Sequence, residues 1–67
     1  MKINGQENQE KALISANITE LLEFFKLSAE RVAVEINGKI IKKADYKETR
    51  LSPDDIIEII HFVGGGI

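Results

Sequence analysis

The chain has 67 residues, a formal net charge of −2 and an isoelectric point near 5.3. So short a chain allows one domain with a small core, and a pocket for a drug-sized ligand, which takes about 300 Å³ or more, would remove much of that core. We therefore expect no self-contained enzyme, and the acidic balance argues against a nucleic-acid partner.

The residue inventory excludes further kinds of chemistry. The chain has no cysteine, which rules out a disulfide, a thiolate metal site and a cysteine nucleophile. His61 is the only histidine and has no imidazole partner, so we predict no metal site and no bound cofactor. The N-terminus lacks the apolar run of a signal peptide and no segment reaches membrane-spanning length, so we expect a soluble, cytoplasmic protein.

The first expected element is a short strand over residues 2–4. It runs into Asn4-Gly5, a dipeptide favoured in two-residue hairpin turns because both positions tolerate positive φ. Residues 11–15 could return antiparallel to this strand, with the polar residues 6–10 forming a longer loop between the two.

A helix is expected to begin at Asn17. Asn17 and Glu20 have the spacing of a capping box, in which the N-cap side chain accepts a backbone N–H of the first turn. The residues that follow place apolar side chains at i, i+3, i+4 and i+7, namely Ile18, Leu21, Leu22 and Phe25. A helix of about ten residues is marginal alone, so this stripe must pack on a sheet, with Phe24 beside it and partly exposed.

The clearest hairpin signal lies in the middle of the chain. Residues 28–31 predict a single turn, and residues 32–36 then alternate so that their valines and isoleucine share one face. A second Asn-Gly pair, at residues 37–38, separates them from a strand over residues 39–42. Residues 44–49 form a polar connector in which Tyr46 is expected to pack rather than to bind a ligand.

The last strand is predicted over residues 56–63, after a turn at residues 51–55. Ile57 and Ile59 point to one side of it, and the other side carries Ile56, Glu58, Ile60 and Phe62. Two arrangements are open. Either the side with Glu58 is exposed and forms an apolar patch that contacts another protein, or both sides are covered, as in a central parallel strand.

Three glycines follow this strand, at residues 64–66, and Ile67 comes after them. Glycine has no Cβ, so such a tail can enter a slot too narrow for other residues, which suits a substrate for another protein's active site. The same run could be an idle, frayed terminus. We divide the chain into a single domain over residues 1–63 and a flexible tail over residues 64–67.

The order of the expected elements predicts an α+β domain of the β-grasp type, with one main helix packed across a small mixed sheet. In this order, the segments 32–38, 56–60 and 62–66 resemble the ThiS family, the ubiquitin-like sulfur carriers of thiamin biosynthesis. The resemblance extends over nearly the whole chain. The related MoaD carriers of molybdopterin synthesis are usually longer and lack the Val-Glu-Ile-Asn-Gly block, so they are the second choice.

The resemblance implies a protein cosubstrate rather than an enzyme. In the family, the E1-like enzyme ThiF adenylates the terminal glycine carboxylate with ATP, and sulfur derived from a cysteine desulfurase then converts it to a thiocarboxylate. The thiazole synthase ThiG receives this sulfur. By position, the reactive glycine is Gly66, with Gly65 and Gly64 as its flexible approach, and the partner-binding residues are Glu58, Ile60 and Phe62.

Ile67 departs from the family, which ends on glycine. Its branched side chain is stiff at χ1 and would enter a path shaped for glycine, so we expect a peptidase to remove it before activation. The alternatives are that Ile67 is tolerated, or that the chain is a non-carrier β-grasp module that binds a partner through its sheet face.

Overall fold

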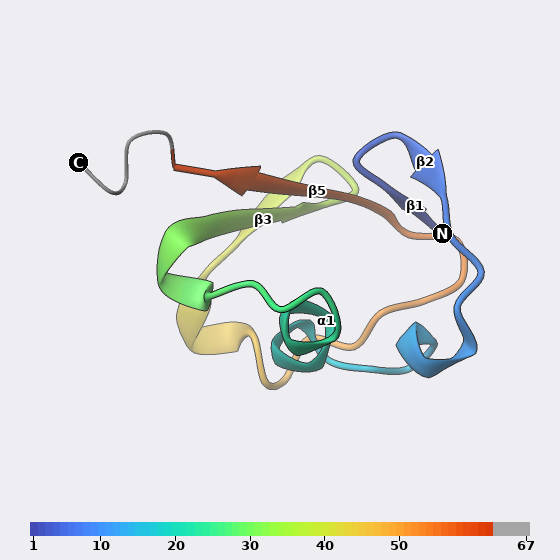
Figure 1. Cartoon of the computed structure of the whole chain (residues 1–67), viewed down its shortest axis with the longest axis horizontal. Helices are drawn as coiled ribbons and strands as arrows, with labels where there is room; N and C mark the ends of the chain where they lie inside the picture. The colour runs from blue at the N-terminus through green and yellow to red at the C-terminus, as the bar shows by residue number, and fades with distance from the viewer. Residues whose placement is uncertain (63–67) are drawn as a thin grey trace.

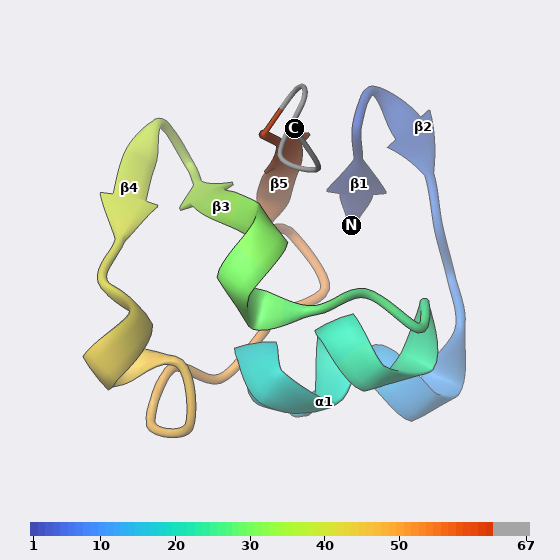
Figure 2. The same ribbon diagram turned by 60° about the vertical axis from the view of Figure 1, so that its left-hand side comes forward.

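The structure, a computed structural model, describes residues 1–62. In this part of the chain five strands form one sheet, and helix α1 (Ile18–Phe24) packs across one side of it (Figures 1 and 2). The strands are β1 (Lys2–Ile3), β2 (Gln6–Glu7), β3 (Val32–Ile36), β4 (Lys39–Ile41) and β5 (Ile56–His61), in the spatial order β2-β1-β5-β3-β4. The central strand β5 is parallel to β1 and antiparallel to β3. This mixed sheet with one helix is the expected β-grasp arrangement.

Helix α1 begins as predicted. The Asn17 side chain accepts the Glu20 backbone N–H at 2.7 Å, and the Glu20 carboxylate accepts the Asn17 backbone N–H at 2.9 Å, so the capping box is complete. The helix is nonetheless shorter than the ten or so residues expected. It ends at Phe24, and Phe25 is its C-cap. The next residue, Lys26, adopts a positive φ of 59°, and many helices end with a residue of positive φ directly after the C-cap.

The early end of α1 changes the position of Phe25. This residue is the C-cap, and its side chain is 37% exposed instead of lying under the helix with the rest of the apolar stripe. The backbone N–H of Leu27 donates to the Leu22 carbonyl at 2.8 Å, and this bond closes the end of the helix. Phe24 is exposed, as expected, and the Phe24 and Phe25 rings meet edge to face with centroids 5.1 Å apart.

The hydrophobic core lies between α1 and the sheet. Its members come from the helix, from alternate positions of β3 and β5, and from the connecting segments: Met1, Leu13, Ala16, Ile18, Leu21, Leu22, Val32, Val34, Ile36, Tyr46, Leu51, Ile57 and Ile59. The connectors contain three short 3₁₀ turns, η1 (Lys11–Leu13), η2 (Ala29–Arg31) and η3 (Lys43–Asp45). Tyr46, directly after η3, is a packing residue as expected and is buried in this core.

The first hairpin corrects the sequence prediction. The returning strand is β2, with Gln6 opposite Ile3, and not residues 11–15. Asn4 (φ 51°) and Gly5 (φ 82°) form a tight two-residue turn. The residue after such a turn pairs with the residue before it, so Gln6 begins the returning strand opposite Ile3. Residues 11–13 instead form η1, which places Leu13 in the core.

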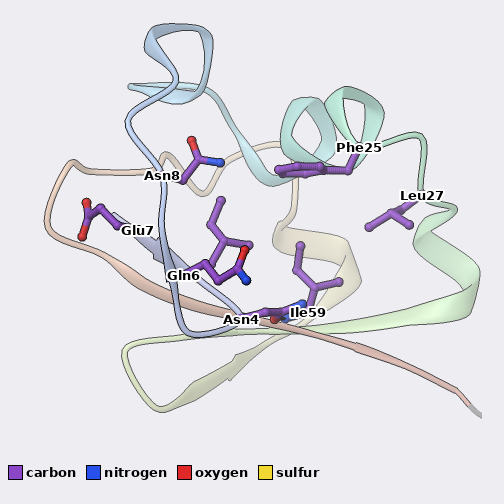
Figure 3. A pocket seen from close by; sticks show the side chains of 8 residues that line it. Asn4, Gln6, Glu7, Asn8, Phe25, Leu27 and Ile59 are labelled. Carbon is purple, nitrogen blue, oxygen red and sulfur yellow. Dashed lines mark hydrogen bonds between the residues drawn. The ribbon is translucent and has the colours of Figure 1, made fainter.

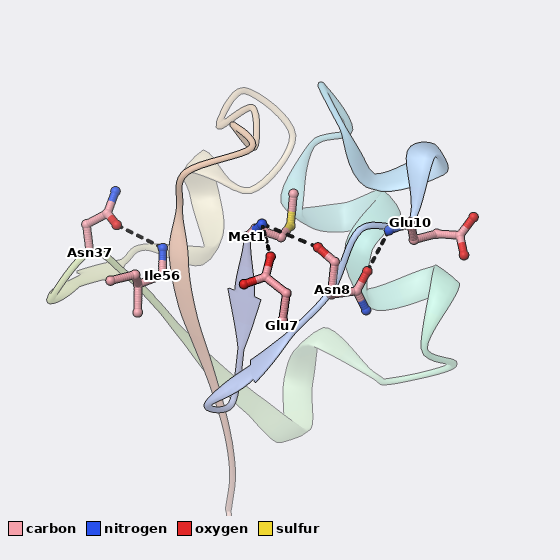
Figure 4. Close-up of polar contacts among 6 residues, drawn as sticks. All are labelled: Met1, Glu7, Asn8, Glu10, Asn37 and Ile56. Atoms are coloured by element: carbon pink, nitrogen blue, oxygen red, sulfur yellow. Dashed lines mark hydrogen bonds and ion pairs between the residues drawn. The ribbon is translucent and has the colours of Figure 1, made fainter.

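Both Asn-Gly turns also hold the central strand. The Asn4 side-chain oxygen accepts the Ile59 backbone N–H at 2.7 Å. The Asn37 side-chain oxygen accepts the Ile56 N–H at 2.9 Å, and its amide donates to the Asp55 carboxylate at 3.0 Å. Figure 4 shows the Asn37 contact on one side of β5 and, beside β1, the N-terminal amine 3.3 Å from the Glu7 carboxylate. The start of β5 is therefore fixed from the β3–β4 turn, and its middle from the β1–β2 turn.

Strand β5 is covered on one side only. Ile57 and Ile59 are buried, whereas Ile56 and Ile60 are 54% and 45% exposed. Of the two arrangements left open by the sequence, the one with both sides covered is therefore wrong. The strand ends at His61, and Val63, which we assigned to it, lies outside the described residues.

Candidate partner-binding face

The side of the sheet opposite α1 carries an uncovered apolar surface. Figure 2 shows α1 and the connecting turns on one side of the strands, and no helix of residues 1–62 on the other. The register of β3, β4 and β5 places six side chains together on this open side. We call this set the outer sheet face: Ala33, Glu35, Ile40, Ile56, Glu58 and Ile60.

Three isoleucines dominate the outer sheet face. Ile40, Ile56 and Ile60 are each about half exposed or more; Ile40 lies in β4, and Ile56 and Ile60 lie in β5. Exposed apolar side chains gathered on one face of a small domain are typical of a surface that contacts another protein. The outer sheet face is therefore the candidate partner-binding surface.

Phe62 extends the outer sheet face toward the end of the chain. Its backbone N–H donates to the Arg31 carbonyl at 3.0 Å, so the pairing with the chain before β3 continues one residue beyond β5. The ring is 49% exposed, and the Lys43 ammonium lies 5.8 Å from its centroid, within the range of a cation–π contact. Phe62 is thus held beside the sheet immediately before residues 63–67.

The structure brings together the predicted partner-binding residues. Glu58, Ile60 and Phe62 alternate along one strand and its extension, on the side away from α1. Sequence reasoning missed Glu35 and Ile40 as members of the same face. The signal was present, because the two-residue turn at residues 37–38 places Glu35 directly opposite Ile40.

The predicted tail residues cannot be placed in the same way. Gly64, Gly65, Gly66 and Ile67 lie outside the described residues. Among residues 1–62, no group of three or more histidine or carboxylate side chains is arranged to hold a metal ion. His61 is exposed at the end of β5, opposite Val32.

A hollow of about 350 Å³ opens at the other edge of the sheet, between the β1–β2 turn and the end of α1 (Figure 3). Its apolar walls are Ile3, Phe25, Leu27 and Ile59, and amide side chains line its rim. The one charged side chain in the lining, Glu7, is paired with the N-terminal amine. Among the described residues, no other acidic or basic side chain lines the hollow.

One further structural observation concerns membranes. In the part of the chain that the structure describes, no helix combines the length and apolar character needed to span a bilayer.

Comparison with known proteins gives consistent matches over the whole chain. The model of the ThiS family matches residues 1–66. The sulfur carrier protein ThiS of Bacillus subtilis (strain 168) is 41% identical over 66 residues, which cover 98% of each chain. The crystal structure of the thiamine biosynthesis protein ThiS from Geobacter metallireducens superposes with a TM-score of 0.82 at 35% identity, covering 97% of this chain and 96% of that one. A thiazole synthase of Magnetococcus marinus contains a similar region, 35% identical over 66 residues, in which this chain covers 20% of that protein.

Proposed function

The chain belongs to the ThiS family, the sulfur carriers of thiamin biosynthesis, and we propose that Gly66 is the residue on which it carries sulfur. The carboxylate of Gly66 becomes a thiocarboxylate, and this sulfur enters the thiazole ring of thiamin. The observation that carries the proposal is the extent of the family match, which runs through the last strand and the three glycines and ends at residue 66.

The proposed reaction makes the protein a cosubstrate that is consumed and regenerated. A carboxylate oxygen of Gly66 attacks the α-phosphate of ATP, and pyrophosphate leaves. The terminal sulfur of a persulfide formed by a cysteine desulfurase then attacks the acyl carbon, and AMP leaves. A thiol cleaves the S–S bond of the resulting acyl disulfide, which releases the thiocarboxylate and leaves a new disulfide on the sulfur donor. Because glycine has no Cβ, the acyl carbon is open to attack and the tail fits a narrow slot. We propose that this cycle takes place in the cytoplasm, where ATP is available.

The described residues support a docking role for β5 that is separate from the reactive end of the chain. Strand β5 is held on both sides by neighbouring strands and by the side chains of two asparagines, and its outer side carries Glu58 and Ile60. In our proposal, this rigid strand docks on the partner enzyme, and residues 64–66 reach into that enzyme's active site. The reactive end and the docking surface are then joined by only a few residues.

Two enzymes are the proposed partners. An E1-like enzyme of the ThiF type activates Gly66, and a thiazole synthase of the ThiG type accepts the sulfur. The similarity between this chain and a segment of the Magnetococcus marinus thiazole synthase supports the second partner, because in that protein a carrier-like region and a synthase share one polypeptide.

Activation requires that Gly66 be the terminal residue. We therefore propose that anything after Gly66, Ile67 included, is removed by a peptidase first. A terminal isoleucine would bring a β-branched side chain next to the acyl carbon, where it would obstruct the attacking sulfur.

The test is reconstitution with purified components. A chain ending at Gly66 is incubated with the ThiF-type enzyme of its organism, ATP, cysteine and a cysteine desulfurase, and its intact mass is measured. We expect the mass to rise by one exchange of oxygen for sulfur. As a matched control, Gly66→Val in a chain of the same length should still bind the enzyme but should not be activated. Binding with neither an adenylate nor a mass change would instead identify a non-carrier interaction module.

A further inference from the structure

Two glutamates face each other at the centre of the outer sheet face. Glu35 in β3 and Glu58 in β5 are direct partners in the antiparallel register, so their side chains leave the sheet on the same side. Side chains in this relation have Cβ atoms about 5 Å apart, and like charges directly opposite destabilise the sheet. Both residues are half-buried.

Within residues 1–62, neither glutamate forms an ion pair with a cation. The one ion pair in that part of the chain joins the N-terminal amine to Glu7. Lys2, which the register places on the same side of the sheet, stands opposite Ile56 and Glu7, and it forms no ion pair with Glu58. The neighbours of the two glutamates are apolar instead. Ile40 lies opposite Glu35, and Ile56 and Ile60 flank Glu58 along β5.

The arrangement sets a condition on any protein that covers the face. Burying the three isoleucines also removes both carboxylates from water, and the lost hydration of the two charges opposes binding unless a cation is supplied. A guanidinium is suited to this role because its planar set of five N–H donors can bond two carboxylates at once and because it is weakly hydrated.

We propose that Glu35 and Glu58 together receive one arginine side chain of the thiazole synthase when that enzyme docks on the outer sheet face. The inference rests on the proposed function, because it assigns a charged contact to the same outer sheet face on which the partner enzyme is proposed to dock. The synthase is the chosen occupant because a region similar to this chain is part of a thiazole synthase polypeptide. The two carboxylates thus provide specificity at the centre of an otherwise apolar contact.

The first test uses the free protein and needs no partner. Glu58→Gln removes the repulsion without changing shape, so the midpoint of thermal unfolding should rise by about 1 to 4 °C. The control is Glu10→Gln, which makes the same charge change at an exposed side chain that points away from the sheet (Figure 4). A Glu58→Gln midpoint that stays at the wild-type value or falls below it would contradict the unbalanced pair.

The second test measures affinity for the thiazole synthase of the same organism, using chains that end at Gly66. Glu35→Gln and Glu58→Gln should each weaken binding by about tenfold, and the wild-type affinity should fall more steeply with salt than that of either variant. Glu10→Gln should bind as the wild type does. A variant that unfolds at a higher temperature and yet binds more weakly cannot be explained by damage to the fold.

The outcomes separate this inference from the proposed function. If the wild type binds the synthase and both glutamine variants bind equally well, the arginine subsite is wrong while the carrier function stands. If the chain binds the synthase through these glutamates but Gly66 is never converted, the subsite stands and the carrier function fails. If the wild type does not bind the synthase, the proposed arginine contact is wrong, even if Gly66 is converted to a thiocarboxylate.

Discussion

Asn4 and Asn37 show how one residue type can serve a turn and a distant strand together. Both adopt positive φ, 51° and 53°, before a glycine, and the sequence predicted both turns from this preference. Their side-chain bonds to β5 were not predicted. The Asn4 contact spans 55 residues, and a contact between positions so far apart leaves no periodic pattern in a single sequence.

The Asn4 bond makes a measurable contribution to stability. Asn4→Gly keeps the backbone conformation but removes the acceptor of the Ile59 N–H, so the free energy of unfolding should fall by about 1 kcal/mol. Asn4→Asp retains an oxygen at the same position and should lose less. Urea denaturation of the three proteins checks this, and equal stability of the glycine and aspartate variants would show that the bond is unimportant.

Tyr46 gives the protein a pH dependence on the alkaline side. Burial raises the pKa of Tyr46 above its ordinary value of 10.0, and a backbone hydrogen bond at Val34 opposes that rise of the pKa. The folded pKa therefore exceeds the unfolded one. It follows that the contribution of the neutral phenol is fully present below about pH 10 and is lost as the pH rises through the folded pKa.

Thermal melts between pH 8 and pH 11 test this directly. The melting temperature of the wild type should fall more steeply above about pH 10 than that of Tyr46→Phe, which has no phenol to ionise. Lysine titration affects both proteins alike and cancels in the comparison. Parallel curves would show that ionisation of Tyr46 does not destabilise the fold.

Among the elements, β5 has one side in the core and the other side exposed. Its alternate residues face either the core or the open side, so neighbouring isoleucines differ in burial. Ile57→Ala should lower the free energy of unfolding by about 2 to 5 kcal/mol, because it opens a cavity in the core. Ile56→Ala, at an exposed neighbour, should cost less than about 1 kcal/mol. Chemical denaturation distinguishes the two, and similar losses would mean that both sides of β5 are packed.

The helix shows the limit of prediction from local pattern. Asn17 and Glu20 fixed its start correctly, since a capping box consists of neighbouring residues. Its end was not predicted, because Lys26 occupies the positive-φ position that glycine usually takes, and so carries no visible stop signal. The exposed position of Phe25 follows from that early end.

At the scale of the whole molecule, the small size of the chain explains the open face. One helix of seven residues and the connecting turns cover a single side of the sheet, and nothing else among residues 1–62 is available for the other. The sequence predicted this architecture from the order of its elements. It could not decide whether the second side of β5 was covered, because a run of isoleucines fits either case.

The same size limit explains why the candidate site was only partly predictable. Glu58, Ile60 and Phe62 belong to one strand and share its alternation, so they were found together. Glu35 and Ile40 join them only through the pairing of β3 with β4 and β5, which is a property of the folded sheet. The position of β5 beside β3 is a tertiary feature, so the facing of Glu35 and Glu58 became visible only with the register.

The most direct test of the carrier function is the intact mass of this protein purified from its own cells while they synthesise thiamin. We predict a population that ends at Gly66 and in which one oxygen is replaced by sulfur. A protein that always retains Ile67 and an ordinary carboxylate under these conditions would contradict the proposal that its C-terminal glycine carries sulfur.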